Sequence, residues 1–294
     1  MSKWLAQANI LTEALPYIKK YAGHILIVKY GGNAMGDADA MHKFAEDIVL
    51  LKQVGIHPII VHGGGPQIGN MLNKLNIKTE FKNGLRVTDK DTMDIAEMVL
   101  CGAVNNTIVS HLNQAGGKAI GISGKDANLV VAEKKATCVQ ESDSNIEKVV
   151  DLGFVGQPVE INPEILHTLV EANIIPVIAP VAIGRNGETY NVNADTIAGA
   201  IAGAVKAKRL YLLTDIEGLL DTDKKLISEI NVAGAKRLLK DDVIVGGMIP
   251  KIETCIKSIE EGVESAVIAD GRVHHSILLE VFTAGGTGTF IKAV

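Results

Sequence analysis

The sequence predicts an α/β fold built on a mainly parallel sheet. Six short, continuous apolar runs alternate with longer stretches rich in Ala, Ile, Leu and Val. Unbroken apolar runs are typical of strands covered on both faces, and alternating strands and helices are typical of a parallel sheet with helices packed on it. The predicted strands are residues 25–28, 58–61, 119–122, 174–179, 210–213 and 266–269, and the clearest helices are 92–113 and 194–205.

Composition excludes several classes of protein. The chain has 294 residues, of which 47% are hydrophobic and 4% aromatic, and its formal net charge is −5. This apolar content excludes intrinsic disorder, while the acidic balance argues against nucleic-acid binding. No run approaches the ~20 apolar residues of a membrane span, so no membrane partner is expected. Cys101, Cys138 and Cys255 lie far apart, which is typical of reduced thiols in a cytoplasmic protein.

The first twenty residues predict a separate amphipathic helix. Its apolar residues are spaced by three or four, which places them on one face, and Pro16 is expected to kink it. This face needs a partner, which is either its own subunit or the same helix of a second subunit. The face consists of Trp4, Ala8, Leu11, Leu15 and Ile18.

The first two predicted strands each end in a glycine cluster. Lys29-Tyr30-Gly31-Gly32 follows the first strand and His62-Gly63-Gly64-Gly65-Pro66 the second. Glycine turns let backbone N–H groups approach an anion, and a helix that starts at Pro66 adds unpaired N–H groups and a positive dipole end. The two clusters together indicate a phosphate site, with purely structural turns as the alternative.

Several polar residues stand where apolar ones would be expected. Lys29 ends an apolar strand, so its ammonium group needs an anionic partner or ligand unless it reaches solvent. Lys251 follows a Gly-Gly-Met-Ile-Pro lead into a predicted helix. In an extended segment Asn191, Asn193 and Asp195 share one side, and Asp195 is placed to cap the helix that follows.

Arg86 lies in a glycine-containing turn before a predicted helix. There it is suited to grip a carboxylate with two parallel hydrogen bonds, or else forms a surface ion pair. The polar segments 133–150 and 184–193 predict hairpins or loops, and residues 180–187 a soft domain boundary. No histidine has metal-site spacing, so no resident metal is expected.

In order, these motifs resemble the amino-acid kinase family, and within it the N-acetyl-L-glutamate kinases. The resemblance covers essentially the whole chain. The first glycine pair and the Asn-x-Asn-x-Asp segment recur across the wider family. The segments Asn83-Gly84-Leu85-Arg86-Val87-Thr88 and Gly121-Ile122-Ser123-Gly124-Lys125-Asp126 look particular to the acetylglutamate kinases.

The resemblance implies a three-layer αβα sandwich around an eight-stranded sheet. It also implies that ATP, with Mg²⁺, phosphorylates the side-chain carboxylate of N-acetyl-L-glutamate to an acyl phosphate in arginine biosynthesis. Residues 23–183 would form the amino-acid lobe with the dimer interface, and residues 184–294 the nucleotide lobe. Lys29 and Lys251 would stabilise the transferring phosphoryl group, and Asp195 would hold both lysines. The phosphate-binding glycines would be Gly31, Gly32, Gly64 and Gly65, and the acetylglutamate ligands Gly64, Gly65, Arg86, Asn191 and Asn193.

Residues 1–22 resemble the N-terminal helix of arginine-inhibited, hexameric members, where paired helices join dimers into a ring. That resemblance implies an oligomerisation helix and an arginine site between this helix and the C-terminal segment. The alternative is that the C-terminal segment is only the last core helix and a turn. The candidate arginine ligands are Tyr21, Lys206, His275, Glu280 and Gly286.

Three other functions stay open. The first is a family member with a different acceptor, such as carbamate, glutamate or aspartate, although aspartate kinases normally carry a regulatory extension. The second is a catalytically silent arginine sensor or scaffold, against which Lys29, Lys251 and Asp195 argue. The third is an NAD(P) oxidoreductase, because Gly63, Gly65 and Gly69 give a spacing one residue longer than the dinucleotide fingerprint.

Overall fold

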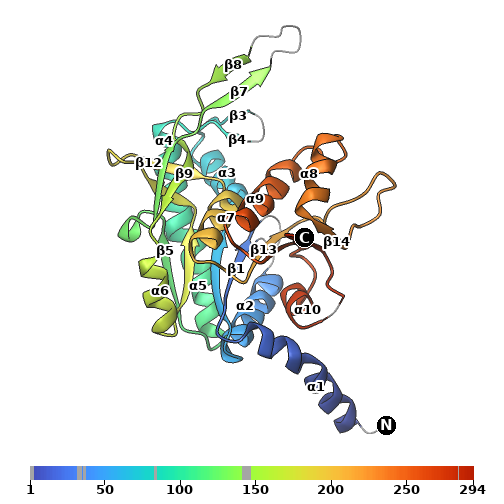
Figure 1. Cartoon of the computed structure of the whole chain (residues 1–294). Coiled ribbons are helices and arrows are strands. Elements are labelled where there is room, and N and C mark those ends of the chain that lie inside the picture. Colours follow the sequence, from blue (N-terminus) through green and yellow to red (C-terminus); the bar gives the residue numbers. More distant parts are fainter. Residues whose placement is uncertain (1–2, 32–34, 36–37, 83–84, 141–146, 284) are drawn as a thin grey trace.

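A single large sheet forms the centre of the molecule (Figure 1). The computed structural model describes residues 3–31, 35, 38–82, 85–140, 147–283 and 285–294, and over these residues the sheet has eight strands. All neighbours are parallel except β15 and β16. In spatial order the strands are β14 (Glu229–Asn231), β16 (Thr289–Lys292), β15 (Ser265–Asp270), β13 (Arg209–Thr214), β1 (Ile25–Tyr30), β2 (His57–His62), β10 (Ile175–Ala179) and β5 (Ala119–Ser123).

The six predicted strands are confirmed as β1, β2, β5, β10, β13 and β15. Every residue of β13 and β15 is buried, as unbroken apolar runs predict. The strand at one edge, β14, and its neighbour β16 were not predicted. They are short and only partly buried, so they lack the unbroken apolar signature.

Helices cover both faces of the sheet, which confirms the αβα sandwich. In β1, Leu26 and Val28 pack into a core with α2 and α5, whereas Ile27 packs into a second core with α7 and α9. The helices are α1 (Lys3–Tyr21), α2 (Ala38–Gln53), α3 (Gly65–Lys74), α4 (Lys90–Glu97), α5 (Asn105–Gln114), α6 (Glu164–Glu171), α7 (Ala194–Ala204), α8 (Val232–Lys240), α9 (Met248–Glu260) and α10 (Ser276–Phe282), with a 3₁₀ turn η3 (Asp126–Asn128).

The predicted helix 92–113 has a wider turn in its middle. A π-helical segment, η2 (Met98–Val104), joins α4 to α5. Such segments are often found at functional sites. By length and composition, Lys90–Gln114 is apolar enough to cross a membrane, but here it packs on α2 and the sheet.

A smaller sheet closes into a barrel beside the main one. It contains β11 (Val181–Ile183), β12 (Thr189–Val192), β9 (Val155–Ile161) and β6 (Val130–Lys134). The predicted hairpins are confirmed, since β11 pairs with β12 and β7 (Thr137–Gln140) with β8 (Glu147–Val150). Two further short strands, β3 (Phe81–Lys82) and β4 (Leu85–Arg86), also pair. The expected boundary at residues 180–187 falls within the β11–β12 hairpin, and the division into lobes stays a prediction.

Helix α1 projects from the body of the molecule (Figure 1). Its apolar stripe is open to solvent, with Trp4 76% and Leu11 71% exposed, whereas Tyr21 at its end is buried. The helix continues through Pro16. Most of the stripe, from Trp4 to Leu15, therefore does not pack on the described part of its own chain. Ile18, near the body of the molecule, is partly buried, so packing on its own subunit holds only for this end.

Candidate functional site

Two lysines converge on one buried carboxylate. Lys29 Nζ lies 2.9 Å from Asp195 Oδ1, and Lys251 Nζ donates to Asp195 Oδ2 at 2.7 Å. Lys29 comes from the end of β1, Asp195 from the first turn of α7 and Lys251 from the first turn of α9. The side chains of Lys29 and Asp195 are less than a tenth exposed, so the partner that burial of Lys29 requires is Asp195.

The electrostatics of this triad follow from burial and charge. Burial alone would raise the pKa of Asp195, but the charges of Lys29 and Lys251 outweigh it and hold that pKa below its ordinary value. Burial lowers the pKa of Lys29, against the opposing attraction of Asp195. One carboxylate thus faces two ammonium groups, which leaves a local excess of positive charge for an anionic ligand.

Asn193, not Asp195, caps helix α7. Asn193 Oδ1 accepts a hydrogen bond from Thr196 N–H at 3.0 Å. The expected capping role of Asp195 is therefore wrong. The helix begins two residues earlier than a cap at Asp195 requires, so Asp195 lies inside the first turn and points to the lysines.

The two glycine turns lie against each other. Gly63 N–H donates to Tyr30 O at 2.8 Å, which joins the second turn to the end of β1. A Cβ on Gly31 would lie 2.8 Å from Lys29 Nζ, so glycine there leaves room for the lysine to fold back toward Asp195. Gly32 lies outside the described residues. Gly64 precedes helix α3, and the predicted helix after the second cluster is confirmed, with Pro66 in its first turn.

The triad, the second glycine turn and the expected substrate ligands line one cleft of about 320 Å³. Apolar residues that the motifs did not predict form its remaining walls. They come from strands, helices and a loop whose shared location is not visible in local sequence patterns. The lining residues are Lys29, Gly63, Gly64, Gly65, Ile68, Phe81, Arg86, Leu100, Val155, Pro180, Asn191, Val192, Asn193, Ala194, Asp195 and Lys251.

Arg86 is held in the cleft by neutral groups. Its guanidinium donates to Gly65 O at 3.1 Å and to Thr79 Oγ1 at 3.2 Å, and it stacks on the ring of Phe81. Burial lowers its pKa, but an arginine stays charged at neutral pH. Among the described carboxylates none pairs with Arg86, so the surface ion pair is absent from that part of the chain and the positive charge can bind an anion.

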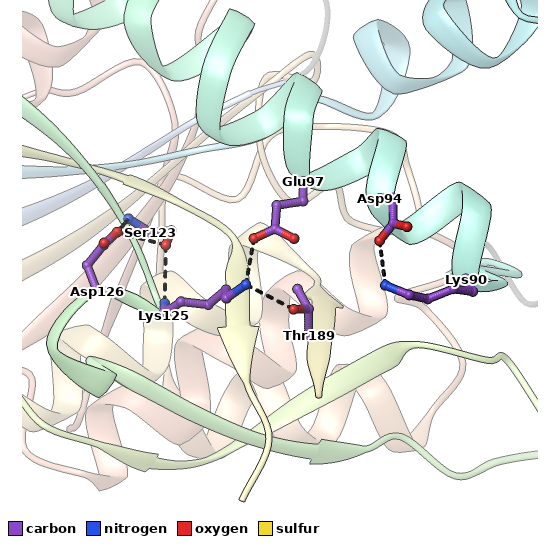
Figure 2. A network of polar contacts seen from close by, with 7 residues as sticks. All are labelled: Lys90, Asp94, Glu97, Ser123, Lys125, Asp126 and Thr189. Atoms are coloured by element: carbon purple, nitrogen blue, oxygen red, sulfur yellow. Dashed lines mark hydrogen bonds and ion pairs between the residues drawn. The ribbon is translucent and has the colours of Figure 1, made fainter. Parts of the chain in front are cut away.

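A polar network ties β12 to helix α4 (Figure 2). Lys125 Nζ donates to Glu97 Oε1 at 2.7 Å and to Thr189 Oγ1 at 3.0 Å. Thr189 lies two residues before Asn191 in β12, so this contact supports the strand that brings Asn191 to the cleft. Lys125 itself does not line the cleft.

Three of the five candidate arginine ligands share a second cavity of about 440 Å³, between α1 and the C-terminal segment. Tyr21, Glu280 and Gly286 line it, and Arg209, which the motifs did not predict, lies among them. Glu280 Oε1 also accepts hydrogen bonds from Gly288 N–H at 2.8 Å and from Thr287 N–H.

The other two candidates lie elsewhere. Lys206 Nζ donates to the backbone carbonyl of Glu261, and His275 Nδ1 lies 2.6 Å from Asp47 Oδ1. Neither lines the second cavity.

Comparison with known proteins bears on the whole chain. The profile of the amino acid kinase family matches residues 24–270. A protein of Rhodospirillum centenum named acetylglutamate kinase is 60% identical over 289 residues, which cover 98% of this chain and 95% of that protein. A protein of Parvibaculum lavamentivorans with the same name is 60% identical over 288 residues, with the same shares of coverage.

Solved structures with low sequence identity share the fold. N-acetylglutamate synthase from Neisseria gonorrhoeae, complexed with coenzyme A and N-acetyl-glutamate, matches with a TM-score of 0.83 at 23% identity, over 98% of this chain and 63% of that one. Carbamate kinase from Giardia lamblia bound to AMP-PNP matches with a TM-score of 0.65 at 16% identity, over 93% of this chain and 100% of that one.

The triad predicts a stability effect that a surface ion pair does not have. Asp195→Asn is expected to destabilise the fold by about 3 kcal/mol, because it leaves two ammonium groups close together without a counter-charge. The matched control is Asp94→Asn, which breaks the exposed pair with Lys90 (Figure 2) and is expected to leave the free energy of unfolding almost unchanged. Urea unfolding at pH 7 measures both, and equal losses would contradict the role of Asp195.

Proposed function

The chain belongs to the amino acid kinase family, and from that premise we propose that it transfers the γ-phosphoryl group of ATP to the side-chain carboxylate of N-acetyl-L-glutamate. The product is an acyl phosphate, N-acetyl-L-glutamyl 5-phosphate, in arginine biosynthesis. The observation that carries the proposal is the convergence of Lys29, Lys251 and Asp195 beside Arg86 in one cleft. The names of the relatives at 60% identity support the acceptor.

The cleft suits an acceptor that carries two carboxylates. We place one carboxylate on Arg86, whose guanidinium has no described anionic partner. Asn191 and Asn193 hold the body of the substrate, because Asn193 uses its Oδ1 as the helix cap and keeps its amide N–H groups for a ligand. The second carboxylate then faces Gly64, Gly65 and the lysines.

Charge and position supply the catalysis. Phosphoryl transfer passes through a loose, in-line transition state that needs alignment and neutralisation of negative charge. The acceptor carboxylate is already ionised near pH 7 and needs no general base. Lys29 and Lys251 offset the repulsion between the carboxylate and the phosphates, and Asp195 keeps both ammonium groups in place. The backbone N–H groups of Gly64 and Gly65 add donors.

The nucleotide site proposed here is a third cavity, of about 510 Å³, next to the start of α9. It includes residues 215–220 and 243–245 with Met248, the first residue of α9, and Lys251 follows one turn later. Gly246 and Gly247 precede α9, and a Cβ on either would meet open space, so phosphates can approach the helix N-terminus.

Mg²⁺ is expected to arrive on the ATP phosphates. The described residues contain no group of three His, Cys, Asp or Glu side chains that suits a metal ion, and Asp195 is engaged with the lysines. When bound, Mg²⁺ supplies further neutralisation of the phosphate charge.

We also propose that α1 joins subunits into a hexamer built from dimers, and that arginine inhibits the enzyme from the second cavity. The exposed apolar stripe of α1 supports the first point. The buried carboxyl group of Glu280 beside Gly286 and Tyr21 supports the second, because a carboxylate can pair with a guanidinium. Arginine would act by favouring one arrangement of the lobes over another.

The acceptor is tested by ADP release in a coupled assay. With Mg²⁺ and ATP, turnover with N-acetyl-L-glutamate is expected to exceed turnover with glutamate, aspartate and carbamate by at least ~10²-fold, because the neutral acetamido group and both carboxylates are recognised together. Faster turnover with any of the other three acceptors would overturn the assignment.

Lys29 is expected to matter for turnover rather than for nucleotide binding. Lys29→Met keeps the length of the side chain and removes the charge, so kcat should fall by roughly 10²–10³-fold, whereas the Kd for ATP should change little. Lys90→Met, at an exposed lysine, is the control and should retain wild-type kcat. A kcat of Lys29→Met within a few-fold of wild type would show that Lys29 has another role.

Assembly and inhibition are separated by two variants. Deletion of residues 1–20 should give dimers that arginine no longer inhibits, whereas Glu280→Gln should lose inhibition while keeping the wild-type mass. Light scattering measures the mass, and the ADP assay with added arginine measures inhibition. A truncated hexamer with normal inhibition would exclude both roles of α1.

A further inference from the structure

His62, the last residue of β2, directs its ring back onto the glycine turn. The ring is fully buried, and its Nδ1 lies 2.7 Å from the carbonyl oxygen of Gly63. On the opposite side of the ring, His62 Nε2 lies 3.1 Å from Nδ2 of Asn105, which is also buried. No step of the mechanism above uses either side chain.

The contacts of Asn105 determine which nitrogen of His62 carries the proton. Asn105 Nδ2 lies 3.0 Å from Val177 O, and a carbonyl oxygen can only accept, so this atom is the amide nitrogen. It therefore also donates to His62 Nε2, which must be unprotonated. Burial lowers the pKa of His62 to about 4, which keeps the ring neutral at pH 7. The proton of the neutral ring is then on Nδ1, which donates to Gly63 O.

Through the peptide that joins Gly63 to Gly64, the contact of His62 with Gly63 O sets the direction of the Gly64 N–H. In a trans peptide the C=O and the N–H point in opposite directions, and the described chain contains no cis peptide. Holding Gly63 O toward His62 thus turns Gly64 N–H away from the ring. Both glycines line the cleft, and among the described residues none accepts a hydrogen bond from Gly64 N–H.

We propose that His62 and Asn105 are positioning residues, which aim the Gly64 N–H into the cleft as a preorganised donor to the transferring phosphoryl group. The inference rests on the proposed function, because the donor role of Gly64 belongs to it. His62 acts through the backbone and does not touch the substrate.

The surrounding structure is built to accept this pair. Asn105 is the first residue after the π-helical segment η2. A Cβ on Gly121 of β5 would lie only 1.7 Å from Asn105 Oδ1, so glycine at that position lets the amide reach His62. Leu100 of η2 packs against Gly64, because a Cβ on Gly64 would lie only 2.4 Å from Leu100 Cδ2. The π-helical segment η2 therefore packs against the glycine turn and supports it.

Two conservative variants separate the two contacts of the ring. His62→Asn places an amide N–H near the position of Nδ1 and can still donate to Gly63 O. His62→Gln places an amide oxygen near Nε2 and can still accept from Asn105, but it loses Gly63. We expect kcat with N-acetyl-L-glutamate to fall roughly 10- to 100-fold in His62→Gln and at most about fivefold in His62→Asn. KM for both substrates should change less than kcat.

A purely structural role predicts the reverse order, because His62→Gln keeps the buried amide of Asn105 satisfied. Equal kcat in the two variants, or a higher kcat in His62→Gln, would overturn the proposal. Thermal unfolding of each variant is measured as well, so that a loss of folded protein is distinguished from a change in the orientation of the Gly64 N–H.

A measurement on the wild-type protein does not depend on turnover. The ¹⁵N chemical shifts of the His62 ring, assigned by their loss in either variant, should show a protonated Nδ1 and an unprotonated Nε2 at pH 7. A protonated Nε2 would refute the inference. Failure of wild-type turnover with N-acetyl-L-glutamate would instead refute the proposed function and leave the ring assignment intact.

Discussion

The site depends on one electrostatic constraint, which is that a single buried carboxylate must hold two lysines. Lys29, Asp195 and Lys251 come from β1, α7 and α9, which lie far apart in the sequence. Each ammonium group would be costly to bury alone. The sandwich brings the three elements together, and the remaining positive charge is what a phosphoryl group requires. The fold and the chemistry therefore share one set of interactions.

The backbone donors of the cleft need support of a different kind. A glycine turn can present N–H groups to an anion because it lacks side chains, and for the same reason it is free to turn elsewhere. His62 and Asn105 restrict that freedom through two hydrogen bonds of the buried His62 ring, one to Gly63 O and one to Asn105. Preorganised donors lose little energy to reorganisation when charge develops, so a rigid turn is worth more to a kinase than a flexible one.

Residue patterns predicted the central strands and most of the cleft, but not its details. Lys29 at the end of an apolar run predicted an anionic partner unless the lysine reached solvent; the structure shows Lys29 buried, with Asp195 as that partner. The sequence pattern predicts Asp195 as the cap of α7, whereas the structure shows Asn193 there. Asn and Asp both cap helices, and these two residues lie only two positions apart. Lys206 and His275 lie outside the second cavity. A residue can be close in sequence to the lining residues and still direct its side chain elsewhere.

The sequence by itself determined the α/β class, the glycine turns that follow the first two strands and the need of Lys29 for an anionic partner once it is buried, because those depend on local periodicity and on the cost of burying charge. Only the tertiary structure decided that Asn193 rather than Asp195 caps α7, that a π-helical turn delivers Asn105 to His62, and that most of the α1 stripe is exposed over the residues that the structure describes. These outcomes depend on contacts between segments far apart in the chain. A change of one residue in helical register redirects every side chain that follows, and hydrophobic periodicity does not reveal such a change.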